Sequence, residues 1–261
     1  MMYRLSEASV LSSKIELEQL PKGKLLINTI NAHSYNQAQK DSLFAEALAG
    51  GDVLIPDGAS IVKACRWLKA KSQPKERIAG WDLFVFEMEQ LEKESEKISL
   101  KNEKSGLAVH KLKVMFMGSS EKVLKKIRLR AAKDYPHLDV VTYSPPYKPE
   151  FSEEDNAAII KAINEANPDL LWIGMTAPKQ EKWTYQHWGK LNIHCHVGTI
   201  GAVFDFYAGT MKRAPQWWQN HSLEWLYRLI REPRRMWRRY IIGNPLFIWN
   251  ICNERLRRND Q

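Results

Sequence analysis

Short apolar segments alternate along this chain with longer amphipathic segments, and this alternation is what most constrains the fold. We expect strands at residues 25–30, 52–56, 112–118, 138–143, 169–175 and 193–197. Strands that alternate with helices are typical of a parallel sheet covered by helices. With 261 residues, 44% of them hydrophobic, the chain can bury a full core. The sequence therefore predicts an α/β fold with Rossmann-like parallel sheets and flanking helices in two closely packed lobes.

A charged segment at residues 92–111 marks the expected boundary between the lobes. It has dense mixed charge and little hydrophobicity, which is typical of a helix end that runs into a flexible connection. We therefore expect an N-terminal α/β lobe over residues 1–100 and a Rossmann-like lobe over residues 101–210. A helical appendage rich in arginine and tryptophan follows over residues 211–261.

Most of the positive charge lies in that appendage. Residues 211–261 hold eleven lysines and arginines against four acidic residues, a surplus of seven in a chain whose net charge is +9. Such asymmetry favours attraction to phosphates or to an anionic lipid surface. Arginine outnumbers lysine there, and its planar guanidinium suits bidentate phosphate contacts.

The appendage also segregates its side chains by helical period. On a helical wheel its arginines share one arc, and apolar residues such as Leu229, Ile230 and Trp237 share another. Glu232-Pro233 must kink or split the helix. A basic amphipathic helix that contains tryptophan suits the membrane interface. The alternative is a helix packed on the body with solvated arginines.

The remaining composition limits the cellular setting. The N-terminus lacks an apolar run of the signal-peptide type, and no run reaches the roughly 18 apolar residues of a membrane span. Three cysteines without metal spacing favour free thiols in the cytoplasm. His194 and His196 alternate along an expected strand, and we expect one of them to face the core rather than to bind a metal.

Polar residues follow the first two expected strands. Thr29 and Asn31 end one strand, and Asp57-Gly58 follows the next. Because the carboxyl ends of parallel strands meet at one sheet edge, a hydroxyl and a carboxylate could converge there. Asp57, partly desolvated, could accept a proton from an attacking hydroxyl as a general base. The alternative is an Asp-Gly turn in which Asp57 caps the next helix.

Two later strand ends are candidate ligand sites. Gly118-Ser119-Ser120 opens a helix whose N–H groups could receive a diphosphate, although such a turn is also common as plain structure. Thr176 precedes a helix that begins near Pro178. In that helix Gln180 and Glu181 could read the hydroxyls of a sugar or ribose. The alternative for both is a solvated first turn favoured by the helix dipole.

An ordered series of motifs resembles the WecG/TagA/CpsF glycosyltransferases, glycosyltransferase family 26, from about Leu25 to Arg239. Thr176-Ala177 stand where members of that family commonly carry Gly-Ser. The matching motifs are Thr29-x-Asn31, Pro56-Asp57-Gly58, Arg77-x-x-Gly80-x-Asp82-Leu83, Pro178-Lys-Gln-Glu181, Gly198 to Asp205, Lys212-Arg-Ala-Pro215, and Glu224-Trp-Leu-Tyr-Arg-Leu229 with Glu232-Pro-Arg-Arg235.

The resemblance implies a metal-independent, inverting transferase. It would move N-acetylmannosamine, its uronic acid or glucose from a UDP donor to a saccharide on polyprenyl diphosphate, for cell-surface polysaccharide. The implied partners are the UDP-sugar, the lipid-linked acceptor and an anionic membrane surface, with no nucleic acid. The implied location is the cytoplasmic face of the membrane, as a peripheral protein. No cofactor is expected; the sequence has no D-x-D pair for a metal, so positive side chains would stabilise the departing UDP.

The resemblance also assigns roles to residues. Asp57 resembles the catalytic base, and Thr29 lines the reaction centre beside it. The residues expected to bind the donor are Asn31, Arg77, Gly118, Thr176, Gln180, Glu181, Gly198, Gly201 and Asp205. The residues expected to meet the acceptor diphosphate or the membrane are Lys212, Arg213, Arg228, Arg231, Arg234, Arg235 and Arg238.

Two other classes of function are open to the sequence. A non-catalytic adaptor could use the basic tail to bind membrane or nucleic acid, with a degenerate nucleotide fold behind it. The ordered motifs argue against it, because an adaptor does not need Asp57 and Gln180 in their places. A dinucleotide-dependent oxidoreductase would need a Gly-rich fingerprint and an acidic residue at the expected distance, and the sequence has neither.

Overall fold

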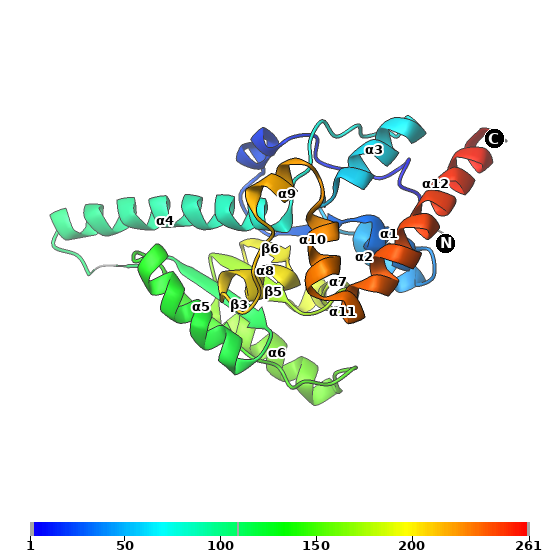
Figure 1. The fold of residues 1–261 in the computed structure, drawn as a ribbon. Helices are drawn as coiled ribbons and strands as arrows, with labels where there is room; N and C mark the ends of the chain where they lie inside the picture. Colours follow the sequence, from blue (N-terminus) through cyan, green and yellow to red (C-terminus); the bar gives the residue numbers. More distant parts are fainter. Residues whose placement is uncertain (1–2, 109, 260–261) are drawn as a thin grey trace. The chain divides into compact units, whose positions relative to one another are not determined.

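A six-stranded parallel sheet with flanking helices forms the framework, as predicted (Figure 1). The computed structural model describes residues 3–108 and 110–259. The strand order is β2-β1-β6-β5-β3-β4. The strands are β1 (Leu25–Ile30), β2 (Val53–Pro56), β3 (Lys113–Gly118), β4 (Asp139–Tyr143), β5 (Leu170–Gly174) and β6 (His196–Thr199).

By their packing the residues divide into two units. Unit 1 comprises residues 1–18, 29–79 and 212–261, and unit 2 comprises residues 19–28 and 80–211. The C-terminal segment therefore packs with residues 29–79, which lie far from it in sequence. The boundaries of these units cut across the three consecutive ranges expected from the sequence.

Unit 1 contains most of the helices. Its core gathers Tyr35, Phe44 and Ile61 with Phe247 and Ile251, all buried. The rings of Tyr35 and Phe247 meet edge to face at 5.4 Å. Its helices are α1 (Ala32–Ala38), α2 (Ser42–Ala49), α3 (Ala59–Leu68), α9 (Gln216–Asn220), α10 (Glu224–Arg231), α11 (Pro233–Trp237) and α12 (Gly243–Asn259), with a π-helical turn η3 (Arg238–Ile242) before α12; the short helix η1 (Lys14–Gln19) crosses its boundary.

Unit 2 contains the longest of the described helices and a core rich in aromatic residues. Phe84 contacts Phe116, Trp172 and Tyr207, and Phe116 contacts Phe204. All five side chains are at most 2% exposed, so they exclude water from one face of the sheet. The helices are α4 (Gly80–Lys104), α5 (Glu121–Asp134), α6 (Glu153–Ala166), α7 (Lys179–His187), η2 (Trp188–Lys190) and α8 (Gly201–Tyr207).

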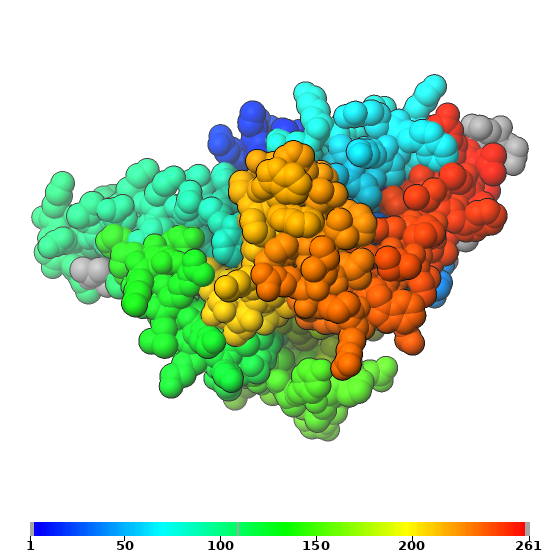
Figure 2. All heavy atoms as spheres, viewed as in Figure 1, coloured from blue at the N-terminus to red at the C-terminus, as the bar shows by residue number. Residues whose placement is uncertain are grey.

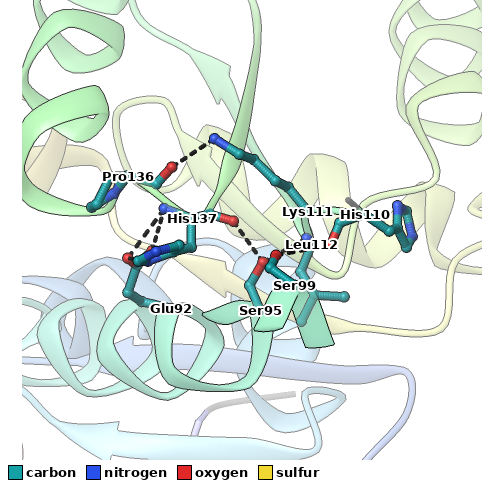
Figure 3. Close-up of polar contacts among 8 residues, drawn as sticks. All are labelled: Glu92, Ser95, Ser99, His110, Lys111, Leu112, Pro136 and His137. Carbon is teal, nitrogen blue, oxygen red and sulfur yellow. Dashed lines mark hydrogen bonds and ion pairs between the residues drawn. The ribbon is translucent and has the colours of Figure 1, made fainter. Parts of the chain in front are cut away.

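The helix end expected in the charged segment at residues 92–111 lies late in it, because α4 continues to Lys104. Buried polar groups hold this part of the helix (Figure 3). Ser95 donates to the carbonyl of His137 at 2.6 Å and accepts from the N–H of Leu112 at 2.9 Å. Glu92 accepts from the backbone N–H of His137 at 3.1 Å. These tertiary contacts override the low hydrophobicity of the segment.

The basic tail is split where proline predicts it. α10 ends at Arg231, and Pro233 opens α11 as its first residue. Only part of the apolar arc expected from the helical wheel packs against the protein. Met236 is buried, but Ile230 is 63% exposed. The tail atoms, orange to red in Figure 2, form one continuous part of the surface of unit 1.

Candidate active site in unit 1

The ends of β1 and β2 bring the predicted polar residues together. The backbone N–H of Asp57 donates to the carbonyl of Ile30 at 2.8 Å, which ties the two strand ends. A methyl group on Gly58 would lie 3.7 Å from Cβ of Asn31, so these two residues are neighbours. Asp57 follows directly after Pro56, the last residue of β2. The two strand ends therefore meet at one edge, with Asp57-Gly58 beside Ile30 and Asn31, and the convergence of the Thr29 hydroxyl with the Asp57 carboxyl stays a prediction.

Asp57 does not cap the following helix, so the alternative of an Asp-Gly turn with a capping aspartate is wrong. Gly58 is the N-cap of α3, and no side chain caps that helix. Asp57 is half-buried. Burial raises its pKa to about 6, and the nearby Glu224 carboxylate adds to the rise, while Arg77, Arg239 and Arg228 oppose it. A carboxyl with that pKa is a stronger proton acceptor than an ordinary aspartate.

Thr29 and Asn31 flank the same strand end in different ways. Thr29 is half-buried near the end of β1. Asn31 is the N-cap of α1, and its Oδ1 accepts from the N–H groups of His33 and Ser34 at 3.0 and 3.1 Å. Its Oδ1 is therefore occupied by capping the helix, and its amide Nδ2 is the group that can donate to a ligand.

Arg77 lies at the same edge. The N–H of Ile78 donates to the carbonyl of Pro56 at 3.1 Å, which holds this loop against the end of β2. The Arg77 guanidinium forms an ion pair with Glu224 at 2.9 Å, and both side chains are mostly buried. Glu224 lies in the first turn of α10, so this pair connects the tail to the strand ends.

The tail arginines do not share one environment. Arg228 and Arg239 influence the charge of Asp57. Arg235, which is exposed, pairs with Glu232 at 2.9 Å and influences Arg239. Other predicted arginines are exposed on the outside of the tail: Arg231 beside the Tyr227 ring, Arg234, and Arg238 beside the Trp237 ring. Lys212 is exposed and Arg213 half-buried, both before α9.

Sequence reasoning assigned no role to three residues at this centre: His33, Glu224 and Arg239. Arg239 lies on the arginine arc of the tail, and η3 places it beside Asp57, with its Nε buried and without a hydrogen-bond partner among the described residues. Burial lowers the pKa of His33 to about 4, and Arg239 contributes, so His33 is neutral at neutral pH. Glu224 belongs to the motif Glu224-Trp-Leu-Tyr-Arg-Leu229. Its negative charge in an arginine-rich helix is the sequence feature that could have indicated a role.

The predicted donor residues lie mainly in unit 2, at the ends of β3, β5 and β6. Gly118 and Gly174 are opposite each other in the sheet, and a side chain on Gly118 would strike the Gly174 carbonyl at 2.3 Å. Gly118 also has a φ of +123°, so packing alone requires glycine there. Ser120 caps α5 through its side chain. Thr176 is exposed in the loop before α7.

Gln180 and Glu181 are buried, so the solvated first turn is wrong. Their exposures are 4% and 2%, and Gln180 Nε2 donates to Glu181 Oε1 at 2.9 Å. Gln180 Oε1 also accepts from the N–H of Met175 at 3.1 Å. Burial raises the pKa of Glu181 to about 7, although its hydrogen bonds lower it. Its Oε2 has no hydrogen-bond partner among the residues that the structure describes.

The three remaining donor residues have structural roles as well. Gly198 leaves room for the ring of Trp172, which would lie 2.3 Å from an added Cβ. Gly201 leaves room for the Met175 carbonyl, 2.1 Å from such an atom. Asp205 accepts from the Thr210 hydroxyl at 2.9 Å and so closes the turn after α8.

The histidine expected to face inward is His196. Its Nδ1 lies 2.9 Å from Glu87, and its Nε2 lies 2.9 Å from the carbonyl of Pro21, so both ring nitrogens have partners. Among residues 3–108 and 110–259, no group of three histidine, cysteine, aspartate or glutamate side chains could hold a metal ion. Within the same ranges, no helix has the length and apolar character needed to cross a membrane.

Comparison with known proteins agrees with the motif series. Residues 3–261 match the model of the glycosyl transferase WecG/TagA/CpsF family. Relatives named N-acetylglucosaminyldiphosphoundecaprenol N-acetyl-beta-D-mannosaminyltransferase are 29% identical in Bacillus subtilis (strain 168), over 88% of this chain and 79% of the relative, and 28% identical in Bacillus spizizenii, over 90% and 82%. One from Staphylococcus aureus (strain MW2) is 26% identical, over 87% and 80%. This chain therefore belongs to the WecG/TagA/CpsF family of glycosyl transferases.

Proposed function

We propose that this enzyme transfers a sugar, with inversion, from a UDP donor to a saccharide carried on polyprenyl diphosphate. The observation that carries the proposal is the carboxyl of half-buried Asp57 at the ends of β1 and β2, with Arg77, Arg228 and Arg239 influencing its charge. The names of the relatives support N-acetylmannosamine as the sugar and N-acetylglucosaminyl diphospholipid as the acceptor. The uronic acid and glucose remain the other donors to test.

In the proposed reaction the acceptor hydroxyl oxygen attacks the anomeric carbon of the donor sugar. The bond from that carbon to the β-phosphate oxygen breaks, and UDP leaves with the bonding electron pair. The hydroxyl proton passes to the Asp57 carboxylate. Attack on the face opposite the departing UDP inverts the anomeric configuration. Asp57 suits this step, because its raised pKa makes it a competent general base near neutral pH.

We assign the diphosphate charge to arginines of unit 1. Guanidinium groups bind phosphate oxygens in a bidentate manner, and in a partly buried centre such contacts are stronger than in water. Arg228 and Arg239 are half-buried. Since these groups supply fixed positive charge, we expect turnover in the presence of a chelator. For donor binding, the paired side chains of Gln180 and Glu181 are our candidates in unit 2, because Glu181 Oε2 is buried without a hydrogen-bond partner among the described residues.

We assign the outer surface of the tail to the membrane interface. Exposed apolar residues lie there among exposed arginines: Ile230, Trp237, Ile241, Ile242, Ile248 and Trp249 are each at least 43% exposed. Tryptophan and isoleucine beside arginine are typical of helices that lie in the headgroup region of an anionic bilayer. A lipid-linked acceptor is presented at that depth, so this surface would bring the enzyme to its substrate.

The decisive experiment is UDP release from a panel of UDP-sugars, with and without a short-chain N-acetylglucosaminyl diphospholipid, in chelator. We expect one UDP-sugar to release UDP only when the acceptor is present, and UDP-N-acetylmannosamine is the first donor to test. The product should be resistant to a hydrolase specific for the anomeric configuration of the donor. If no UDP-sugar of the panel released UDP, the result would contradict the transferase proposal for these substrates. Release that requires a divalent cation would contradict only the metal-independent form of it.

A further inference from the structure

The ion pair between Arg77 and Glu224 is the most buried of the arginine–carboxylate pairs that the structure describes around the catalytic centre. Its Nη1 to Oε2 distance is 2.9 Å, and the two side chains are 23% and 20% exposed. By contrast, the Arg235–Glu232 pair at the other end of α10 leaves the arginine 60% exposed. A partly buried, charge-assisted contact of this kind holds its partners far better than a surface pair does.

Backbone contacts place this pair beside the base. The loop that carries Arg77 is fixed at Ile78, whose N–H donates to the Pro56 carbonyl at 3.1 Å, and Ile78 is fully buried. Asp57 is the residue after Pro56. The Arg77 guanidinium acts electrostatically on Asp57, and its ion pair is with Glu224.

The charged groups that act on Asp57 come from three elements. Glu224 and Arg228 belong to α10, Arg77 to the loop before α4, and Arg239 to η3. His33 on α1 faces Arg239 and is neutral at neutral pH. The three guanidinium groups lower the pKa of Asp57, so without an opposing charge they would make it a weaker base. Glu224 is the carboxylate that opposes them and raises this pKa.

We propose that Glu224 is a positioning residue of the catalytic centre, which binds Arg77 and so prevents Arg77 from forming an ion pair with Asp57. This inference rests on the proposed function. Its consequence is that Asp57 remains free to receive the proton of the acceptor hydroxyl, because Arg77, the arginine that lowers the pKa of Asp57 most, is already paired with Glu224. The position of Glu224 in the first turn of α10 supports the role, since a helix N-terminus stabilises a carboxylate there.

The test compares Glu224→Gln with Glu224→Asp, with Glu7→Gln as the matched control. Glu7 belongs to the same unit and pairs with Arg4 at the same 2.9 Å, but it does not act on Asp57. In Glu224→Gln we expect the pKa of Asp57 to fall. The acid limb of the plot of kcat/KM against pH should therefore move to lower pH by about one unit or more. We also expect the plateau to fall by up to about tenfold, because Asp57 becomes a weaker base. Glu224→Asp and Glu7→Gln should keep the wild-type limb.

An activity-independent measurement completes the test. The titration of the Asp57 carboxyl, followed by carbon-13 NMR and assigned with Asp57→Asn, should shift in the same direction in Glu224→Gln, provided that thermal unfolding shows a folded protein. An unmoved limb and an unmoved Asp57 titration in folded Glu224→Gln would overturn the inference. If Glu224→Gln does not fold, the Asp57 titration in Arg77→Gln decides: an unmoved titration overturns the inference, and a rise supports the competition of Arg77 for Asp57. Absence of transferase activity in the wild type would instead count against the proposed function.

Discussion

At the scale of single residues, the reactivity of this enzyme follows from where its carboxyl groups are buried. Asp57 and Glu181 both have raised pKa values, and in both cases burial is the largest cause. They differ in their neighbours: Asp57 lies among arginines and Glu224, whereas Glu181 is bonded to a neutral glutamine. Asp57 is accordingly our candidate for the catalytic base, whereas Glu181, buried and bonded to Gln180, remains a candidate for donor binding.

We predict that Asp57→Asn abolishes most turnover and leaves the fold and donor binding intact. The amide is nearly isosteric, but it cannot accept the proton, and general bases contribute about 10²–10⁴-fold to a rate. The measurements are kcat in the UDP-release assay and a calorimetric titration with UDP. Asp52→Asn, an exposed aspartate before β2, is the control and should retain activity. Unchanged turnover in Asp57→Asn would exclude Asp57 as the base.

We predict that Glu181 makes the protein less stable as the pH rises through about 7. Its pKa in the folded state is raised from 4.5 to about 7, so the folded protein favours the protonated form. This stabilisation is fully present below about pH 4.5 and is lost as the pH rises through the folded-state value. Glu181→Gln should therefore flatten the pH dependence of the free energy of unfolding, by on the order of 2 kcal/mol.

The control for Glu181 is Glu165→Gln, which removes an exposed carboxylate from the same unit. Urea denaturation at several pH values measures both variants. The same slope of stability against pH in Glu181→Gln and in the wild type would contradict the prediction. A flattened slope in both variants would show that the effect is general surface charge.

At the scale of secondary-structure elements, the sequence predicts which segments are strands and helices better than it predicts where they end. Strand ends at Asn31 and Asp57 are visible because apolar runs stop there. The extension of α4 to Lys104 is not visible, because Ser95 and Ser99 are buried by partners distant in sequence. Likewise, nothing local distinguishes Arg239 from Arg238, and only the π-helical turn places Arg239 beside Asp57.

We predict that Ser95→Ala destabilises unit 2 by roughly 1–3 kcal/mol, since it leaves two partly buried backbone groups without their partner. The Ser95 hydroxyl is fully buried and bonds the His137 carbonyl and the Leu112 N–H (Figure 3). Urea denaturation gives the change in free energy of unfolding. Ser105→Ala, an exposed position beyond the end of α4, should change it little. Equal effects of the two changes would contradict the role assigned to Ser95.

For α12 we predict that membrane binding and folding depend on different faces. Ile248 and Trp249 are 61% and 65% exposed, whereas Ile251 is buried in the core. Changing Ile248 and Trp249 together to serine should weaken binding to vesicles of anionic phospholipid by about tenfold or more, with stability retained. Ile251→Ser should instead lower the melting temperature. Vesicle co-sedimentation and thermal unfolding separate the two effects, and unaltered vesicle binding of the double variant would remove α12 from the proposed interface.

At the scale of the whole molecule, the C-terminal helix is part of the unit that holds the proposed catalytic centre. The sequence suggests an appendage over residues 211–261, and its arginine and tryptophan content is indeed unlike that of the body. Yet α12 packs with α1 and α3, and Phe247 and Ile251 join the core of unit 1. The composition of such a segment reflects mainly its exposed residues. The residues that pack in the core, here Phe247 and Ile251, are too few to change it.

Polar contacts attach α12 to the unit at both ends of its length. The Asn36 side chain donates to the Gly243 carbonyl at 2.7 Å, and Glu254 accepts from the N–H of Ser6 at 2.7 Å and from the Tyr35 hydroxyl at 2.6 Å. Asn36 and Tyr35 belong to α1, whose N-cap is Asn31. α12 therefore packs against the same helix that begins at the strand end of the proposed catalytic centre.

We accordingly predict that a chain ending at Ile242, which lacks α12, loses both the stability of unit 1 and transferase activity. The deletion removes Phe247 and Ile251, and each buried side chain of this size contributes about 2–5 kcal/mol. It also leaves the Tyr35 hydroxyl and two backbone N–H groups without Glu254. Limited proteolysis should cleave unit 1 rapidly in this variant, whereas a chain ending at Arg258 should resist as the wild type does. A protease-resistant chain ending at Ile242, still active on a soluble short-chain acceptor, would show that α12 is dispensable and that its contacts to α1 do not support the catalytic strand end.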